Sequence, residues 1–326
     1  MIGVDVGGTK VAVAAIDGTT PREAVERPTD VTSGDALLAE IESAAREVMG
    51  RIGDAGGVGV GMPSQIDFAT GTLISSVNIP LAGVPLREEL ASRLGVPVYV
   101  DNDANVAALA EAHLVEGGPA SHLVMLTLGT GVGGGVVIDG RIFRGASGLG
   151  AELGHVVIEQ DGPPCPGNCP NRGCLEAMCS GTALGVEATE LGEAKPDTVL
   201  GRIVAERGHA TGEDLEEAAR AGDTDALLIC ERFARRLGTG IASFVNTFEP
   251  EHFVIGGGVS RAADLFLEAA ITEAGSRALP ALFERVTIGL ARAGADAGVV
   301  GAGLLAAQEL SRDTPDPRAT ATGGAI

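Results

Sequence analysis

The sequence has no tryptophan and a single tyrosine, and aromatic residues make up 3% of its 326 residues. Lysine and arginine are also scarce: 23 stand against 44 aspartates and glutamates, which gives a formal net charge of −21. Proteins that bind nucleic acid or anionic membranes do so through basic patches. The shortage of basic residues therefore argues against both kinds of partner.

Long apolar runs are absent as well. No stretch reaches the roughly 18 to 20 apolar residues that a membrane-spanning helix requires. The chain opens with MIGVDVGGTKVAVAAID, in which Gly3 and Asp5 stand where a secretory signal has a basic segment and an apolar run. We therefore expect a cytoplasmic protein with no membrane partner.

Cysteine is rare and clustered. Four of the five cysteines lie in CPGNCPNRGCLEAMC at 165–179, and the fifth is Cys230. The cluster could be a disulfide framework, a thiol redox centre, a metal site or a coincidence. A disulfide framework would be odd in number and placed in a reducing compartment, and the segment lacks the CxxC motif of thiol redox centres.

Strand-like apolar runs alternate with helical patterns, which is typical of an α/β fold. Helices are predicted at 35–49, with Asp35 as the N-cap, at 85–94, ended by Gly95, and at 226–248. The length allows two ordinary domains, each with a sizeable core. The tail at 311–326 lacks apolar periodicity and is predicted to be disordered.

An approximate repeat relates two parts of the chain. VDVGGTKVAVAAIDG at 4–18 aligns with LTLGTGVGGGVVIDG at 126–140. Each copy reads as a strand, a Gly/Thr turn, a second strand and an Asp-Gly turn, which predicts a β-hairpin with a glycine-rich tip. Such hairpins are common, so chance accounts for part of the likeness. The repeat nevertheless favours two similar α/β halves.

The glycine-rich tips are suited to phosphate. Glycine lets backbone N–H groups converge on an anion, and Thr9 and Thr130 add hydroxyl groups. Asp5 adds a carboxylate suited to hydrated Mg²⁺. Neither tip matches GxxxxGK[ST], so ordinary turns remain the structural alternative. A third glycine cluster, VIGGGVS at 254–260, ends a strand and opens onto a helix, where the adenosine part of a nucleotide would fit.

Four Asx residues, Asp101, Asn102, Asp103 and Asn105, stand where VPVYV passes into a helical pattern. Such junctions at the carboxyl ends of strands are where α/β proteins place ligands. A single Asp or Asn would satisfy the need for a helix N-cap. The excess assigns a functional role to Asn102 and Asp103, because an aspartate here could take the proton from a hydroxyl that attacks a γ-phosphate.

Together these motifs resemble the ROK family of sugar kinases and repressors. The resemblance rests on six motifs in order between residue 2 and about 310: GVDVGGTK at 3–10, GVGMPSQID at 59–67, DNDAN at 101–105, LGTGVGGG at 128–135, GAELGH at 150–155 and GCLE at 173–176. It implies the actin-like ATPase (ribonuclease H-like) fold, with two α/β domains and an interdomain cleft. A small domain would comprise 1–103 plus 297–310, and a large domain with a zinc-binding loop would comprise 104–296.

The resemblance also implies the roles of individual residues. Asp103 matches the general base, and the residues that match sugar-binding positions are Asn78, Asn102, Asp103, Glu152, His155 and Glu176. The positions that match the two phosphate loops and the adenosine site are Asp5, Gly8, Thr9, Lys10, Thr130, Gly131, Gly257 and Gly258. Taken alone, Glu176 would be a solvated helix residue and His155 a core histidine.

The implied activity is phosphorylation of a hexose by ATP with Mg²⁺, as in bacterial ROK glucokinases that convert glucose to glucose 6-phosphate, by a homodimer. Kinases for fructose, N-acetylmannosamine or N-acetylglucosamine share the same base and hydroxyl ligands and stay open, as does another phosphoryl donor. The alternative from a different class is a sugar-responsive ROK regulator. Such regulators carry an N-terminal helix-turn-helix, whereas the first phosphate loop here follows a strand that starts at residue 2, and the acidic charge opposes DNA binding.

The cysteine cluster fits a metal best. His155, Cys165, Cys169 and Cys174 have the spacing H-x9-C-x3-C-x4-C, and one imidazole with three thiolates fills the four positions of a structural zinc site. A metal would also order the surrounding loop, which is rich in proline, glycine and asparagine. The ROK resemblance implies the same zinc site, but its usual first spacing is C-x-C, so the assignment of Cys165 stays open. Cys179 is expected to be buried rather than a ligand.

Overall fold

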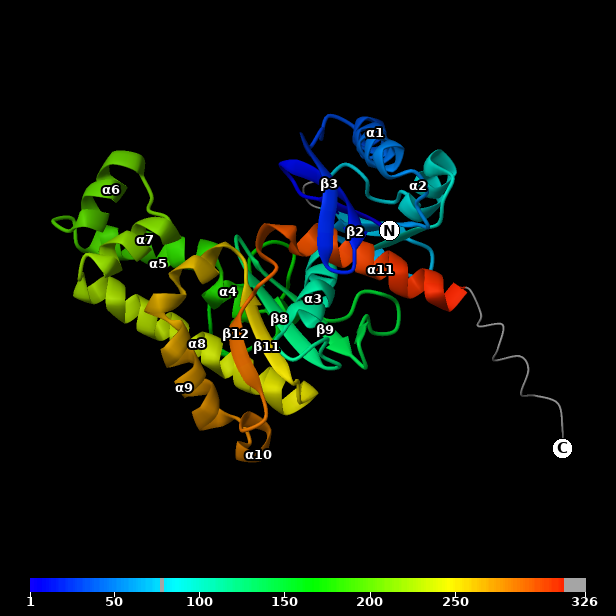
Figure 1. Cartoon of the computed structure of the whole chain (residues 1–326). Coiled ribbons are helices and arrows are strands. Elements are labelled where there is room, and N and C mark those ends of the chain that lie inside the picture. The colour runs from blue at the N-terminus through cyan, green and yellow to red at the C-terminus, as the bar shows by residue number, and fades with distance from the viewer. Residues whose placement is uncertain (77–78, 314–326) are drawn as a thin grey trace. The chain divides into compact units, whose positions relative to one another are not determined.

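The computed structural model describes residues 1–76 and 79–313 (Figure 1). These residues form two compact units. The first comprises Met1–Pro119, Arg141–Gly150 and the chain from Ala293, and the second comprises Ala120–Gly140 and Ala151–Arg292. The predicted sugar ligand Asn78 and the end of the predicted tail, 314–326, lie outside the described residues.

The first unit is built on a five-stranded sheet with the order β3-β2-β1-β4-β7. Its strands are β1 (Ile2–Val6), β2 (Lys10–Asp17), β3 (Thr20–Pro28), β4 (Val58–Met62) and β7 (Val98–Asn102), beside a separate pair, β5 (Ser64–Asp67) and β6 (Thr72–Ser76), and the short β10 (Arg141–Ile142). Its helices are α1 (Gly34–Ile52), α2 (Leu86–Leu94), α3 (Asp103–Leu114), η3 (Gly294–Asp296) and α11 (Ala297–Asp313). Strand β1 pairs antiparallel with β2 and parallel with β4, and β4 pairs parallel with β7.

Helices cover both faces of this sheet (Figure 1). Val98 and Val100 of β7 share a core with α1 and α2, whereas Tyr99, between them, packs with residues of α3 and α11. Neighbouring residues of a strand point to opposite faces, so both faces are buried. Such strands read as continuous apolar runs rather than alternating ones, which is why VPVYV is visible in the sequence.

The second unit has a sheet in which β9, β8, β11 and β12 follow one another. Its elements are β8 (Leu123–Leu128), β9 (Val132–Ile138), η1 (Leu153–His155), α4 (Leu175–Cys179), α5 (Gly181–Ala194), α6 (Val199–Arg207), α7 (Gly212–Arg220), α8 (Thr224–Phe248), β11 (His252–Gly256), η2 (Gly258–Leu265), α9 (Leu267–Arg277), α10 (Pro280–Phe283) and β12 (Thr287–Leu290). Strand β8 pairs antiparallel with β9 and parallel with β11, and β11 pairs parallel with β12.

The predicted repeat is confirmed as a pair of hairpins. Strands β1 and β2 are antiparallel from Ile2↔Ala15 to Val6↔Val11, and β8 and β9 from Leu123↔Val137 to Leu128↔Val132. In both units the hairpin is followed by parallel strands at one edge of the sheet. The glycine-rich tips therefore occupy equivalent positions in the two sheets.

The predicted helices are present with small corrections. Ser33, not Asp35, is the N-cap of α1, because the Ser33 hydroxyl accepts a hydrogen bond from the Ala36 N–H at 3.1 Å. Gly95 ends α2 as predicted, in the left-handed conformation. The last helix runs to Asp313, so the first three residues of the tail predicted to be disordered are helical.

Helix α11 lies against the first sheet at a distance that only glycine permits. A Cβ at Gly3 of β1 would come within 1.8 Å of the Val299 carbonyl oxygen, and one at Gly59 of β4 within 1.7 Å of the Ala302 carbonyl oxygen. These two glycines are register partners on adjacent strands. They form a flat surface on which the backbone of α11 rests directly.

Gly301 of α11 makes a similar contact with α3. A Cβ at Gly301 would lie 1.7 Å from the Val106 carbonyl oxygen. The pairing of α3 with α11 explains why α3 belongs to the first unit, although the sequence-based boundary was placed at residue 103. It also fixes the position of Asp103, the first residue of α3.

A substitution at Gly301 should separate the two helices. We expect Gly301→Ala to lower the free energy of unfolding by about 3 kcal/mol, because backbone must move to admit the methyl group. Gly50→Ala is the matched control: Gly50 is also helical, and a Cβ there would meet nothing within 4 Å. That variant should gain up to ~1 kcal/mol from helix propensity. Urea unfolding measures both, and equal effects would contradict the close-packing account.

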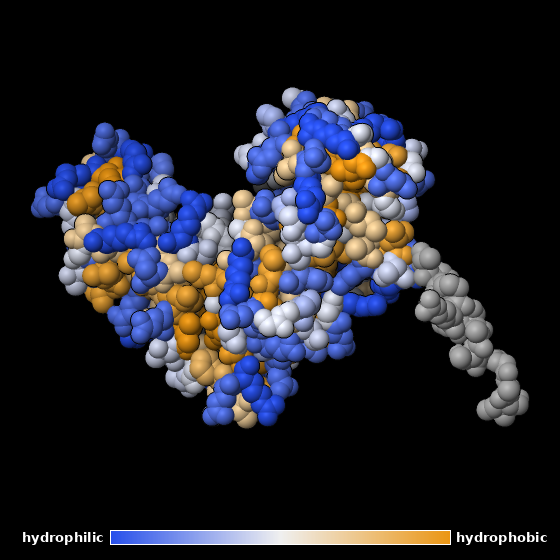
Figure 2. All heavy atoms as spheres, viewed as in Figure 1, coloured by the Kyte–Doolittle hydropathy of each residue, from blue (hydrophilic) through white to orange (hydrophobic). Residues whose placement is uncertain are grey.

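The surface visible in Figure 2 is largely hydrophilic. Hydrophilic residues cover much of the face shown in Figure 2, with smaller apolar areas among them. None of the described helices is long and apolar enough to cross a membrane.

Candidate active site and metal centre

The first group of candidate residues lies where β7 passes into α3. Asn102 is the N-cap of α3, and its Oδ1 accepts hydrogen bonds from the Ala104 N–H at 2.9 Å and the Asn105 N–H at 3.3 Å. Its Nδ2 donates to the Ser64 carbonyl oxygen at 3.3 Å. The Asn102 side chain thus has the structural role of a helix cap, and its contact with a sugar stays a prediction.

Asp103 and Asp5 form a pair of half-buried carboxylates. Asp103 opens α3, where the helix dipole favours a negative charge. Burial, and next the charge of Asp103, raise the pKa of Asp5 to about 6, against an opposing effect of Lys10. Gly298 in the first turn of α11 leaves room for this carboxylate, since a Cβ there would lie 2.4 Å from the Asp5 Cγ. A divalent cation would relieve the repulsion between the two acids.

The first predicted phosphate loop is the tip of the β1–β2 hairpin. The Gly7 N–H donates to the Lys10 carbonyl oxygen at 2.8 Å and closes the turn, while Gly8 and Thr9 are exposed at its tip. Lys10 Nζ lies 2.6 Å from Glu26 Oε1 on β3. This hydrogen bond raises the pKa of Lys10, so the side chain is a cation held beside the loop.

The second predicted phosphate loop, Gly129–Gly131, is bonded to the start of α5. The Gly181 N–H donates to the Gly129 carbonyl oxygen at 2.7 Å, and the Thr182 hydroxyl donates to the Thr130 carbonyl oxygen at 2.7 Å. These contacts use backbone carbonyls of the loop, and the Gly129 N–H donates within the loop to the Gly131 carbonyl oxygen at 2.9 Å. The loop is therefore braced by a helix rather than supported by its hairpin alone.

Val132, which follows this loop, connects it to two predicted sugar ligands. The Val132 N–H donates to Glu176 Oε2 at 2.8 Å. Gly154, next to His155, packs so closely that a Cβ there would lie 2.0 Å from the Val132 carbonyl oxygen. The structure thus brings Glu176 and Gly154, the neighbour of His155, to the two sides of Val132, although 44 residues separate Val132 from Glu176.

A cavity of about 750 Å³ lies beside the second predicted phosphate loop. Its lining residues from the two predicted nucleotide motifs are Gly129, Thr130, Gly258 and Val259. Further lining residues come from the starts of α5 and α7, from the α6–α7 loop and from η2, including Thr182, His209, Thr211 and Arg261. The volume is within the range of small-molecule sites.

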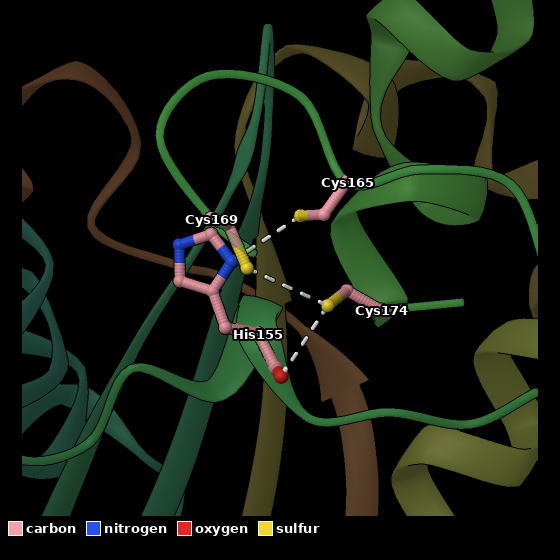
Figure 3. A group of neighbouring side chains, drawn as sticks. All are labelled: His155, Cys165, Cys169 and Cys174. Carbon is pink, nitrogen blue, oxygen red and sulfur yellow. Dashed lines mark hydrogen bonds between the residues drawn. The ribbon is translucent and has the colours of Figure 1, made fainter. Parts of the chain in front are cut away.

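The four predicted metal ligands come together (Figure 3). His155 Nδ1 lies 3.4 Å from Cys165 Sγ, and Cys169 Sγ lies 3.9 Å from Cys174 Sγ. All four ligand atoms lie within 4.8 Å of one another. Tetrahedral zinc, with Zn–S of about 2.3 Å and Zn–N of about 2.0 Å, separates two thiolates by about 3.8 Å and a thiolate from an imidazole nitrogen by about 3.5 Å. The donor set and its spacing fit zinc.

Cys165 therefore belongs to the cluster despite its longer spacing. The extra residues are taken up by a tight loop in which the Cys165 N–H donates to the Asn171 carbonyl oxygen at 2.9 Å and Pro164 forms a bridge with Arg172. Cys179 is buried and lies outside the cluster, as predicted; its Sγ faces the Phe233 carbonyl oxygen at 3.9 Å.

The family model of the ROK family matches residues 1–309. The chain belongs to the ROK family. Among curated relatives, a glucokinase of Halalkalibacterium halodurans is 38% identical over 317 residues, which is 94% of this chain and 95% of the relative.

Solved structures of ROK proteins agree. A ROK hexokinase from Thermus thermophilus is 34% identical, with a TM-score of 0.83 over 96% of this chain and 99% of the other. A ROK glucokinase from Streptomyces griseus, solved in complex with glucose and AMPPNP, is 32% identical, with a TM-score of 0.76 over 94% and 99% of the two chains. The predicted α/β fold, the actin-like ATPase fold of ROK kinases, is thereby confirmed.

Sequence reasoning missed part of the candidate ROK site. The polar residues that line the cavity from α5 to η2 gave no signal, because they look like ordinary helix caps and surface residues; Thr211, for example, forms a capping box with Asp214. The bond from Val132 to Glu176 was also missed, since a backbone donor carries no signal in the sequence.

The raised pKa of Asp5 predicts that the nucleotide-free protein is less stable at neutral pH than at acidic pH. Because the folded value of about 6 exceeds the ordinary 3.8, the folded state binds more protons between these values, and stability falls as pH rises through 6. Without magnesium, the free energy of unfolding of Asp5→Asn should therefore exceed that of wild type by up to ~3 kcal/mol at pH 7.5. The difference should be smaller at pH 5.

Urea unfolding at the two pH values checks this expectation. Asp54→Asn, at an exposed loop position of the same unit, is the control and should change little at either pH. A gain in Asp5→Asn that is the same at pH 5 and 7.5 would contradict the assignment to the Asp5 carboxylate.

Proposed function

We propose that this ROK protein transfers the γ-phosphoryl group of ATP to a hexose, with glucose as the preferred acceptor and glucose 6-phosphate as the product. The observation that carries the proposal is the position of Asp103: a half-buried carboxylate at the first turn of α3, beside Asp5. The glucokinase relatives and the solved complex with glucose and AMPPNP support it.

Asp103 is the proposed general base. Its carboxylate accepts the proton of the attacking sugar hydroxyl, and the dipole at the start of α3 favours a negative charge there. Asp5 would hold Mg²⁺, and the cation would supply neutralising charge for the phosphates. The repulsion between the two carboxylates favours cation binding, because a bound cation removes that repulsion.

The nucleotide is proposed to bind through backbone and hydroxyl donors. The exposed tip at Gly8 and Thr9 and the braced loop at Thr130 and Gly131 supply N–H groups for the phosphates, and Lys10 supplies positive charge. Adenosine would occupy the cavity of about 750 Å³ that Gly258 lines, and Gly257 precedes that residue in the chain. At Gly257 a Cβ would lie 2.3 Å from the Leu128 carbonyl oxygen, so only glycine allows this close turn.

The sugar hydroxyls are proposed to bind Asn78, Asn102, Glu152, His155 and Glu176, in addition to the base. Glu176 uses Oε2 for the Val132 N–H, and Oε1 is the oxygen proposed for a hydroxyl. His155 Nδ1 faces the cysteines, so Nε2 is the nitrogen proposed to meet the sugar. A polyol site needs several such groups because each buried hydroxyl requires a partner.

A structural zinc ion is proposed on His155, Cys165, Cys169 and Cys174. With four protein ligands the metal has no open position, so it supplies order rather than catalysis. We further propose that the two units act as the small and large domains of the sequence prediction, and that the enzyme is a cytoplasmic homodimer that feeds glycolysis. Light scattering of the purified protein tests the homodimer, and elemental analysis tests the zinc ion.

The activity is tested by ³¹P NMR of a reaction with glucose and Mg-ATP. We expect ADP and glucose 6-phosphate in equal amounts. ADP with inorganic phosphate and no sugar phosphate would show that water is the acceptor and would contradict the proposal. Replacing ATP by polyphosphate in a parallel sample tests the alternative donor.

A further inference from the structure

Asp101, two residues before the proposed base, is a buried carboxylate with both oxygens engaged. It is 2% exposed. Oδ2 accepts a hydrogen bond from Arg144 Nε at 2.6 Å. Oδ1 accepts from the Asn102 N–H at 2.8 Å and from Asn105 Nδ2 at 2.9 Å. Asp101 therefore joins Arg144 to the backbone and the first turn of α3.

Arg144 is itself fixed from three sides. Its guanidinium lies over the Phe68 ring, 3.6 Å from the ring centroid, and its Nη2 lies 3.3 Å from Glu309 Oε1 on α11. Its carbonyl oxygen accepts from the Gly150 N–H at 2.9 Å, which closes the loop that carries it. A planar guanidinium suits this combination of ring stacking and in-plane hydrogen bonding, whereas an ammonium does not.

The bonds among Arg144, Asp101 and Asn105 are not those expected of a network that serves stability alone. Within the described residues, the buried Asn105 Oδ1 has no hydrogen-bond partner, and Arg144 Nη2 has the ion pair with Glu309 but no hydrogen bond, so both atoms carry a desolvation cost. Buried ion pairs also add little net stability compared with apolar residues of the same volume. The bonds do, however, fix the peptide unit that leads into Asn102 and the Asn105 side chain in the first turn of α3, on either side of Asp103.

We propose that Arg144 is a positioning residue for phosphoryl transfer. Through Asp101 it fixes the Asn102 peptide and the first turn of α3, and so the direction of the Asp103 carboxylate. The inference rests on the proposed role of Asp103 as general base. Errors of about 1 Å in the placement of a reacting group cost on the order of 100-fold in rate.

The main variant is Arg144→Lys, with Arg87→Lys as its matched control. Arg87 also faces the Phe68 ring, at 5.3 Å from its centroid, and donates to the Phe68 and Ala69 carbonyl oxygens. No hydrogen bond joins it to Asp101 among the residues that the structure describes. We expect kcat to fall on the order of 30-fold to 100-fold in Arg144→Lys, with KM for glucose and ATP within about threefold of wild type. The control should keep kcat within about twofold.

The route through Asp101 is tested by a double-mutant cycle. If Arg144 acts on Asp103 through Asp101, the double variant Asp101→Asn/Arg144→Lys should lose no more than about twofold in kcat beyond the worse single variant. Losses that multiply would show two independent effects and would overturn the route.

Hydrogen–deuterium exchange provides a readout that does not need activity. Amides in peptides covering 101–106 should exchange faster in Arg144→Lys than in wild type, and those peptides should be unchanged in Arg87→Lys. If the wild-type enzyme phosphorylates no hexose, the proposed function fails. If it is active, an unchanged kcat or unchanged exchange at 101–106 in Arg144→Lys overturns the positioning role alone.

Discussion

Asp103→Asn should lower kcat by at least about 1,000-fold while glucose affinity stays within about threefold of wild type. General-base catalysis by a positioned carboxylate contributes roughly 100-fold to 10,000-fold, and an amide cannot accept the proton. The isosteric amide keeps hydrogen bonding to a sugar hydroxyl, so binding should survive. Steady-state kinetics and calorimetric titration with glucose measure the two quantities.

The control for this substitution is Asp35→Asn. Asp35 lies in the first turn of α1 in the same unit, so its replacement removes a favourable charge–dipole interaction of the same kind. It should leave kcat unchanged. If Asp103→Asn were as active as Asp35→Asn, Asp103 would be a helix-start residue and the base would have to be found elsewhere.

Cys174→Ser should remove zinc and raise the KM for glucose by about tenfold or more, because it opens a four-ligand structural site. Cys174 is the N-cap residue of α4 and stands two residues before Glu176. Its Sγ also lies 3.5 Å from the His155 carbonyl oxygen. Loss of the metal should therefore release both proposed hydroxyl ligands together.

Zinc content by mass spectrometry and kinetics with glucose check this expectation. Cys230→Ala is the control, since Cys230 is a buried cysteine outside the cluster and its replacement should keep zinc bound. Zinc loss with unchanged glucose kinetics would separate the metal from sugar binding and contradict the coupling between them.

The sequence predicted what depends on local spacing. The hairpin tips followed from the alternation of apolar residues and glycine, and the metal cluster from a histidine and three cysteines within 20 residues. The spacing rule was too strict for Cys165, because a tight loop can absorb additional residues before the sulfur points to the metal. The longer spacing between Cys165 and Cys169 therefore did not change which four side chains form the cluster.

What the sequence could not provide depends on tertiary packing. Arg144 and Asp101 lie 43 residues apart, and their bond exists only because the segment Arg141–Gly150 returns to the first unit. The position of α3 depends on Gly301, almost 200 residues later, which has no recognisable signal without the helix it touches. The cavity lined by α5, α7 and η2 is likewise formed by helices whose polar residues look ordinary in the sequence.

The central claim is that this ROK protein is an ATP-dependent hexose kinase that prefers glucose. The most direct test is initial-rate kinetics of purified wild-type enzyme with Mg-ATP and a panel of glucose, fructose, mannose, N-acetylglucosamine and N-acetylmannosamine. We predict the highest kcat/KM for glucose, by at least about tenfold over the other sugars, as expected when buried polar groups are left unpaired by the wrong substrate. A higher kcat/KM for another sugar would reassign the substrate, and no phosphorylation of any hexose would contradict the account.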